Sequence, residues 1–173
     1  SIPCADPKSF MDIFPKHYNM ITKTKGFHAT ATYGTLIRLN NSRLLGLEGG
    51  KNFQVNVRDT EGLDIDDFLH KYEIGKRACF NCPIHCKHVW RIKDGDMAGL
   101  LGIGLEFNAA GALHFMAECD DWETIMAFYD RCNRYGLDVA SASAYVAIMM
   151  ELYERQIITK NDTGGLPYEW GSR

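Results

Sequence analysis

The sequence predicts a mainly α-helical, multi-helix domain with one or two short strands. Several segments place apolar residues at helical spacing next to capping residues, whereas only residues 89–93, before Asp94-Gly95, have the pattern of a strand and turn. The chain has 173 residues, of which 46% are hydrophobic and 24% charged, so it can bury a core without disulfides. The sequence contains no internal repeat and no low-complexity tract.

The N-terminal segment predicts helices separated by a break. Asp6 followed by Pro7 is typical of a helix start, and Pro15 is expected to kink or restart this helix. Gly26 is expected to end the segment that follows, and residues 29–39 are compatible with a further helix.

The next segment predicts irregular chain followed by one amphipathic helix. The polar and glycine-rich residues 40–42 and 46–50 favour turns. Residues 65–72 carry apolar side chains at positions i, i+3, i+4 and i+7 behind Asp64, and Gly75 is expected to end that helix.

Residues 98–117 form the most apolar stretch. They include Glu106, Asn108, His114 and four glycines, which are costly in a bilayer. This stretch is therefore interpreted as a buried or site-lining helix rather than a membrane span.

Two helices are predicted near the C-terminus. Asp120 with Glu123 forms a capping box for the first, which ends at Gly136, and the second starts near Ser141 or Ser143. Residues 159–165 predict a polar, turn-rich exit. The side chains expected to face inward are Trp122, Ile125, Met126, Tyr129 and Cys132 in the first helix and Tyr145, Ile148, Met149 and Leu152 in the second.

Charge and cysteine content exclude several classes of protein. The 19 Lys and Arg against 22 Asp and Glu leave a net charge of −3, which argues against a nucleic-acid binder. No secretory signal is visible, and three of the six cysteines fall within eight residues, which favours metal binding over oxidation and indicates a reducing, cytoplasmic setting. Because the sequence does not begin with Met, the true start is expected to lie upstream.

The strongest chemical signal is the run from Cys79 through Cys82 to Cys86. Its C-x2-C-x3-C spacing lets three thiolates from one tight loop face a single centre, and three soft anionic ligands favour an iron–sulfur cluster or zinc. Radical-SAM enzymes have the two intervals in the reverse order, which excludes that class. Positive charge flanks the loop, as a net-negative cluster requires, at Lys76, Arg77, Lys87, Arg91 and Lys93.

Zinc remains the alternative on spacing alone. His85 or His88 can complete a four-coordinate zinc site, although no second pair of closely spaced ligands follows. A 4Fe–4S cluster also needs a fourth ligand. Cys119 and Cys132 lie on predicted helix faces and are more typical of core residues, so the fourth sulfur is expected outside these 173 residues.

Three motifs resemble the aldehyde:ferredoxin oxidoreductases, a family of tungsten enzymes with two pterins and one 4Fe–4S cluster. They are the A-C-F-x-C-P-I-x-C loop at residues 78–86, the N-R-Y-G-L-D run at 133–138 and the M-E-L-Y-E-R run at 150–155. Tyr33-Gly34-Thr35 and Asn52-Phe53 are weaker landmarks of the same family, in the right order. Together these motifs span most of the chain.

The resemblance implies roles for individual residues. Cys79, Cys82 and Cys86 hold the cluster in the matching family motif. The family also grips a pterin with a D-x-x-G-L-D-x loop, in which Asn133 replaces the first aspartate here and loses its charge-assisted hydrogen bonds. The expected pterin-binding residues are Asn133, Gly136, Leu137, Asp138 and Val139. On spacing alone, an ordinary helix–glycine–helix corner capped by Asp138 is the favoured interpretation of this run.

Glu106 is the candidate catalytic acid or base. The family has a G-P-E-Y-E stretch after the cluster, and its equivalent here, residues 104–108, keeps only this carboxylate. His114 can share the same helix face, although a hydrogen-bonded core histidine is the simpler interpretation.

The predicted function is that of a piece of a tungsten-bispterin, 4Fe–4S oxidoreductase that oxidises aldehydes to carboxylic acids with ferredoxin as acceptor. One alternative is the tungsten subunit of a benzoyl-CoA reductase-like enzyme acting on an aromatic thioester. Alternatives from other classes are a zinc-stabilised, non-catalytic interaction module and a stand-alone electron-transfer module. The choice between tungsten and molybdenum stays open.

The resemblance also predicts the organisation of the chain. Residues 1–75 form N-terminal helices and an irregular segment, 76–93 the cluster loop, and 98–158 a helical part that faces the pterin and the cluster. The N-terminal pterin domain and a C-terminal remainder are expected to lie outside it, so this piece alone is expected to be inactive. Its expected partners are ferredoxin, the substrate, the rest of its own chain and, in a homodimer or larger complex, further copies, but no nucleic acid or membrane.

Overall fold

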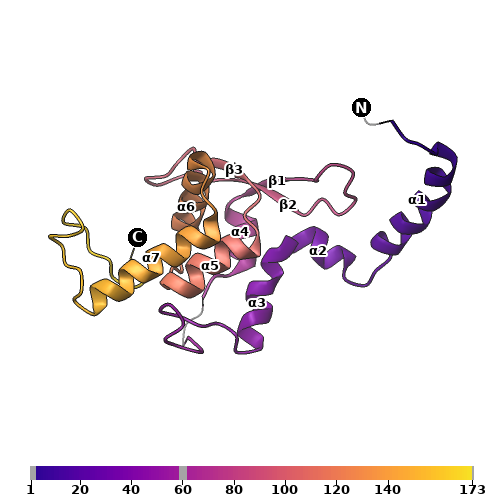
Figure 1. Ribbon diagram of the computed structural model, residues 1–173. Helices are drawn as coiled ribbons and strands as arrows, with labels where there is room; N and C mark the ends of the chain where they lie inside the picture. The colour runs from indigo at the N-terminus through magenta and orange to yellow at the C-terminus, as the bar shows by residue number, and fades with distance from the viewer. Residues whose placement is uncertain (1–2, 59–61, 173) are drawn as a thin grey trace.

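The structure, a computed structural model, describes residues 3–58 and 62–172. These residues form seven α-helices, a short 3₁₀ helix and a small antiparallel sheet that lies at one edge of the helical part (Figure 1). In chain order the elements are α1 (Pro7–Thr22), α2 (Phe27–Tyr33), η1 (Gly34–Leu36), α3 (Ile37–Leu44), α4 (Ile65–Lys71), β1 (Glu73–Arg77), β2 (Lys87–Arg91), β3 (Leu101–Ile103), α5 (Phe107–Ala117), α6 (Trp122–Tyr135) and α7 (Val139–Glu154).

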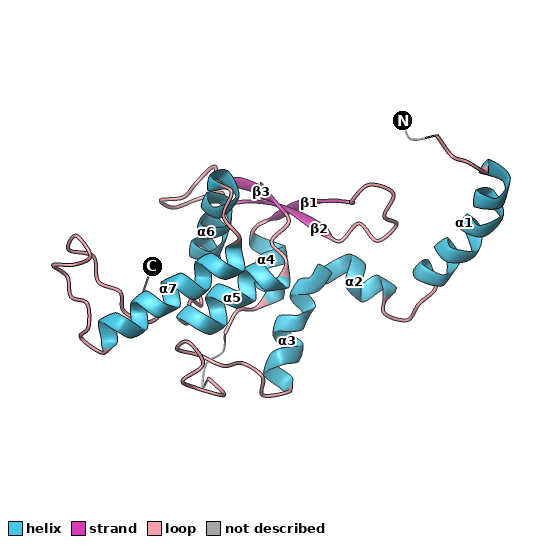
Figure 2. Cartoon of the chain, in the orientation of Figure 1, coloured by secondary structure: helices cyan, strands magenta, loops and turns pink. Residues whose placement is uncertain are grey.

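The mainly α class is confirmed, but the sheet has three strands in the order β1-β2-β3 instead of one or two (Figure 2). The outer strands, β1 and β3, were not predicted from the sequence because each contains a glycine and is stabilised by pairing with β2. Gly75 pairs with Val89, and Gly102 pairs with Trp90. A Cβ atom at Gly102 would overlap the Trp90 ring, so the glycine lets this buried ring lie flat against β3.

The core lies between the sheet and the C-terminal helices. Helix α5 packs against α7 and α6, with α3 alongside it (Figure 1). The fully buried side chains include Leu36, Phe68, Trp90, Ile92, Ile125 and Met126. At the edge of this core, Cys86 directly precedes β2 and lies within electrostatic range of Glu106, which directly precedes α5.

Helix α1 stands away from the rest of the molecule (Figure 1). Asp6 caps it, accepting a hydrogen bond from the Ser9 N–H at 3.0 Å. The helix continues through Pro15, so the expected restart does not occur. None of its residues, all of which the structure describes, is buried, and Phe10, Phe14 and Tyr18 form an exposed aromatic row.

Other local predictions are corrected by one turn or one residue. The polar run 40–42, expected to be a turn, lies inside α3. Asp121 rather than Asp120 caps α6, because its carboxylate accepts the Thr124 N–H at 3.0 Å. Helix α7 begins at Val139, earlier than expected, because Asp138 caps it.

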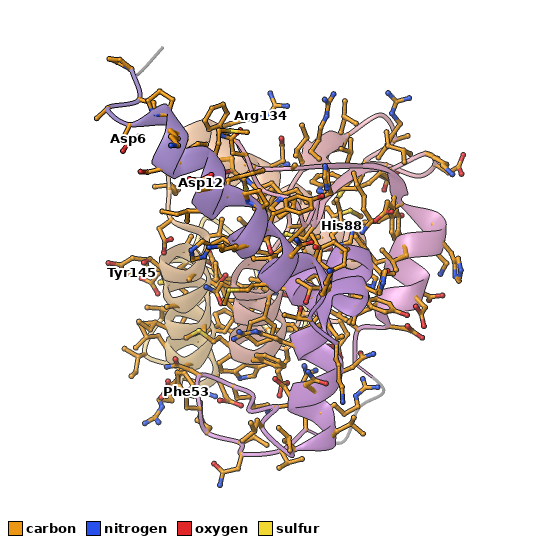
Figure 3. The ribbon with its side chains drawn as sticks, turned by 90° about the vertical axis from the view of Figure 1, so that its right-hand side faces the viewer. Asp6, Asp12, Phe53, His88, Arg134 and Tyr145 are labelled. Atoms are coloured by element: carbon orange, nitrogen blue, oxygen red, sulfur yellow. The ribbon has the colours of Figure 1, made fainter. Side chains whose placement is uncertain are left out.

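The two C-terminal helices differ in how well their buried faces were predicted. The inward face of α6 is confirmed, with Trp122 and Cys132 among its buried residues. The prediction for α7 was wrong: Tyr145 is 71% exposed and lies on the outer side of the helix (Figure 3). The buried side chains of α7 are the small or flexible Ser143, Ala147 and Met150.

Residues 98–117, expected to be one helix, contain β3, a turn and α5. Within the described ranges, no helix combines the length and apolar character needed to cross a membrane.

Candidate functional site

The cysteine loop, residues 78–86, connects β1 to β2. Pairing of Arg77 with Lys87 fixes its base. Within it, the Cys82 N–H donates to the Cys79 carbonyl oxygen at 3.0 Å, and Asn81 adopts a left-handed conformation (φ 55°). The loop therefore coils back on itself, with free thiols at Cys79, Cys82 and Cys86.

The environment of Cys86 links the cysteine loop to Glu106. Burial raises the pKa of the Cys86 thiol, and the negative charges of Glu106, Cys82 and Cys79 raise it further. Cys86 therefore lies within electrostatic range of Glu106 and of the other two cysteines. A bound metal centre would reverse this effect, because a coordinating thiol is deprotonated by the cation.

The three cysteines supply soft thiolate donors from one loop, and such donors suit both an iron–sulfur cluster and zinc. Within the described part of the chain, no three His, Cys, Asp or Glu side chains lie close enough together to hold a metal ion.

His88 is not available to complete a zinc site. Its side chain is only 2% exposed, with Nδ1 against the Glu73 carboxylate and Nε2 3.1 Å from the Tyr33 carbonyl oxygen. Both ring nitrogens therefore face protein oxygens. His85, the other candidate, is exposed, and its Nδ1 lies 2.9 Å from the Pro83 carbonyl oxygen.

The basic flank is only partly directed at the loop. Lys76 was expected to place positive charge around a cluster, but its ammonium group donates to the Ala31 carbonyl at 2.8 Å and to the Thr32 carbonyl. It also lies 3.6 Å from the Glu73 carboxylate. Lys76 therefore joins β1 to the end of α2.

Glu106 immediately precedes α5, at the position of its N-cap. Its Oε2 atom accepts a hydrogen bond from the Thr35 hydroxyl, and that hydroxyl accepts the Phe107 N–H at 2.9 Å. A cavity of about 320 Å³ opens beside the carboxylate, and Arg38 and Asn108 also line it. The side chain is half-buried at a helix end, rather than inside an apolar helix as expected.

His114 belongs to a different cluster. It is 1% exposed, and its Nδ1 lies 2.7 Å from Asp120 Oδ1. Arg58 donates to the His114 carbonyl oxygen at 3.0 Å and forms two hydrogen bonds with Asp120, at 3.0 and 2.7 Å. The interpretation as a hydrogen-bonded core histidine is therefore confirmed.

The predicted pterin loop forms the corner between α6 and α7. Gly136 ends α6 in the left-handed region (φ 69°), where glycine is favoured. Asp138 caps α7, and its hydrogen bond from the Ser141 N–H, 2.8 Å long, lowers the pKa of its carboxyl group. Asn133 donates to the Tyr129 carbonyl oxygen at 2.8 Å. The corner thus has an ordinary capping geometry, and pterin binding by Asn133, Gly136, Leu137, Asp138 and Val139 stays a prediction.

Sequence reasoning missed the residues that join the cysteine loop to Glu106. Thr35 contacts Glu106, 71 residues away in the chain, and the buried His88 contacts Glu73, 15 residues away. The sequence feature that could have indicated these contacts is the Tyr33-Gly34-Thr35 landmark. In the structure, Gly34 lies against Cys86 and Thr35 contacts Glu106.

Comparison with known proteins supports one family over nearly the whole chain. Residues 12–173 match the family model described as aldehyde ferredoxin oxidoreductase, domains 2 and 3. The chain is 28% identical to tungsten-containing aldehyde ferredoxin oxidoreductases of Thermococcus kodakarensis and Pyrococcus furiosus, over 99% of its length and 28% of theirs. It is 24% identical, over 70% of its length and 19% of the relative's, to the WOR-like subunit of an aliphatic sulfonate oxidoreductase from Pyrococcus furiosus.

The chain thus spans little more than a quarter of the length of the oxidoreductases that it matches. The expected family and the mainly helical fold agree with this match. On the extent of the matched family model, this chain belongs to the aldehyde ferredoxin oxidoreductase family and covers part of its domains 2 and 3.

Proposed function

We propose that the chain is the cluster-holding part of a tungsten-bispterin, 4Fe–4S oxidoreductase that oxidises aldehydes to carboxylic acids and reduces ferredoxin. The observation that carries this proposal is the position of three free cysteines on one hairpin loop, with the Glu106 carboxylate in electrostatic range of Cys86. The names of the relatives, which include tungsten and ferredoxin, support it.

Oxidation of a hydrated aldehyde to its acid releases two electrons and two protons, so the protein must handle both. The chemistry that the bound cofactors supply is two-electron oxidation followed by transfer of single electrons. Cys79, Cys82 and Cys86 would hold the 4Fe–4S cluster as thiolates. The corner at residues 133–139 would bind one pterin through its backbone groups and the Asp138 carboxylate.

Glu106 would handle one of the protons. Thr35 holds its Oε2 atom, so Oε1 is the atom left to accept a proton from a substrate hydroxyl in the adjoining cavity. Because the Thr35 hydroxyl is itself fixed by the Phe107 N–H, the carboxylate is held in one orientation before substrate binds.

The test uses the full-length protein purified without air and supplied with a small aldehyde and oxidised ferredoxin. We expect about two ferredoxins reduced for each aldehyde consumed. Cys82→Ser is expected to abolish ferredoxin reduction with loss of iron. Reduction of an aromatic thioester with no activity on aldehydes would replace this proposal by the benzoyl-CoA reductase alternative. Stoichiometric zinc without iron would replace it by the interaction module.

A further inference from the structure

A polar clamp joins the sheet to a short bridging segment, residues 31–35. The clamp consists of Glu73 and Lys76 on β1 and His88 on β2. His88 Nδ1 contacts the Glu73 carboxylate, and Nε2 lies 3.1 Å from the carbonyl oxygen of Tyr33. Lys76 binds the preceding carbonyl groups, with 2.8 Å to that of Ala31. Three successive carbonyl groups at the end of α2 are thus held by two side chains of the hairpin that carries the cysteine loop.

The clamp brings the bridging segment into close contact with the last cysteine. A Cβ atom on Gly34 would lie 2.8 Å from the Cys86 carbonyl oxygen and 3.1 Å from His88 Nε2. Gly34 also has φ +58°, a conformation that side chains disfavour. The segment therefore packs backbone against backbone on Cys86, and only glycine permits this approach.

The same segment reaches the catalytic candidate at its other end. Thr35, the residue after Gly34, donates to Glu106 and accepts the Phe107 N–H at 2.9 Å. Two consecutive residues thus touch the cysteine loop and the carboxylate. Any movement of the segment would change the cover over Cys86 and the orientation of Glu106 together.

The charged and polar groups of the clamp are satisfied by one another and by the bridging segment. Glu73 is 19% exposed and lies between His88 and Lys76, whose ammonium group is 3.6 Å from its carboxylate. Removing one partner leaves a charge or a hydrogen-bonding group unpaired in a largely dry environment, which is costly. The clamp is therefore rigid as long as all three side chains are present.

We propose that Glu73, His88 and Lys76 are positioning residues, which hold the bridging segment over Cys86, shield the iron bound there from solvent and keep Glu106 aligned. This inference rests on the proposed function in one respect, since it requires a cluster at the cysteine loop. It adds an outer layer of residues to that cluster, and such layers commonly control metal retention.

The first test compares Glu73→Gln and His88→Phe with a matched control in the anaerobically purified full-length protein. Gln keeps the shape of Glu73 without its charge, and Phe keeps the ring that packs edge-on against Phe68. The control is Asp67→Asn, which breaks an ion pair of 3.2 Å between Asp67 and Lys71 on the exposed side of α4. The readouts are the rate of iron loss to a ferrous chelator and the EPR spectrum of the reduced cluster.

We expect about tenfold faster iron loss and an altered EPR line shape in both clamp variants, and wild-type behaviour in the control. Glu73→Asp keeps the negative charge and is therefore expected to retain iron better than Glu73→Gln. A merely structural role would lower the unfolding temperature without changing the line shape of the cluster in folded protein, and that result would overturn the inference.

The second test displaces the segment while leaving the three clamp residues themselves unchanged. Gly34→Ala forces a Cβ atom against Cys86, whereas Gly164→Ala imposes a similar left-handed strain (φ +65°) with no atom within 4 Å. Only Gly34→Ala should speed iron loss and lower aldehyde oxidation. If wild type carries no iron, the proposed function fails. If wild type carries a cluster and both alanine variants retain it equally well, only the positioning inference fails.

Discussion

Glu106 lines a cavity and has one carboxylate oxygen fixed by the Thr35 hydroxyl, which is an arrangement that suits a preoriented proton acceptor. We expect Glu106→Gln to lower kcat for aldehyde oxidation by about 100-fold or more, because the amide cannot accept the proton. Iron content should be unchanged. Glu154→Gln, at a surface ion pair of 3.5 Å with Lys51, serves as the control. Wild-type turnover in Glu106→Gln would remove Glu106 from the catalytic role.

Asp120 gives a pH-dependent contribution to stability. Burial opposes its ionisation, but the hydrogen bonds from His114 and Arg58 outweigh that effect and lower its pKa from 3.8 to about 2. A lowered pKa in the folded state means that the stabilisation is complete above about pH 4 and is lost as the pH falls towards 2. Because the carboxylate is 34% exposed, we assign it about 1–2 kcal/mol.

The measurement is urea unfolding of wild type and Asp120→Asn between pH 7 and pH 3. We expect the variant to be less stable at pH 7 and the difference to shrink as the pH is lowered below 4. A difference that stays constant across this range would show that the ionised carboxylate is not the source of the stabilisation.

At the scale of elements, α6 depends on a cap that the sequence pattern placed one residue too early. Asp121 Oδ2 accepts the Thr124 N–H at 3.0 Å and the Thr124 hydroxyl at 2.6 Å. Asp121→Ala should therefore cost about 1 kcal/mol in the free energy of unfolding, and Asp121→Ser only a few tenths. Thermal unfolding monitored by circular dichroism checks this. Equal stability of the two variants would contradict the assignment of the cap.

The elements show which parts of a fold local patterns can predict. Helix α6 was predicted well because large apolar residues repeat at helical spacing on one face. In α7 the large Tyr145 and Ile148 are exposed, whereas the small Ser143 and Ala147 are buried, so size was a poor guide to the buried face. Strands β1 and β3 exist because β2 pairs with them, and nothing in their own short sequences indicates that partner.

The candidate site divides in the same way. The cysteine spacing is local in the sequence, so the loop was predictable from residues 79–86 alone. The contacts of Thr35 with Glu106 and of His88 with Glu73 bring together separate elements, and their residue types are too common to signal a site. The family landmark at residues 33–35 marked the position of the bridging segment without revealing its contacts.

At the scale of the whole molecule, α1 and the core should differ strongly in stability. Helix α1 buries none of its residues, and a single helix of this length is only marginally stable in water. We expect its amides to exchange with deuterium at nearly the rate of an unfolded chain, whereas those of α5 should be protected. Hydrogen-exchange mass spectrometry of the 173-residue chain measures this. Equal protection of α1 and α5 would contradict the separation seen in Figure 1.

The chain matches only part of its full-length relatives, and this limits what it is expected to do by itself. It spans 28% of the length of the tungsten-containing relatives that it matches. We therefore expect catalysis only from the full-length protein.

The most direct test of the assignment is the metal content of the full-length protein purified without air. Iron and acid-labile sulfide should each be present at about four per polypeptide, with an EPR signal on reduction. Cys79→Ser, Cys82→Ser and Cys86→Ser should each remove most of the iron, the sulfide and the signal. Protein that contains zinc, or neither iron nor sulfide, would contradict the account.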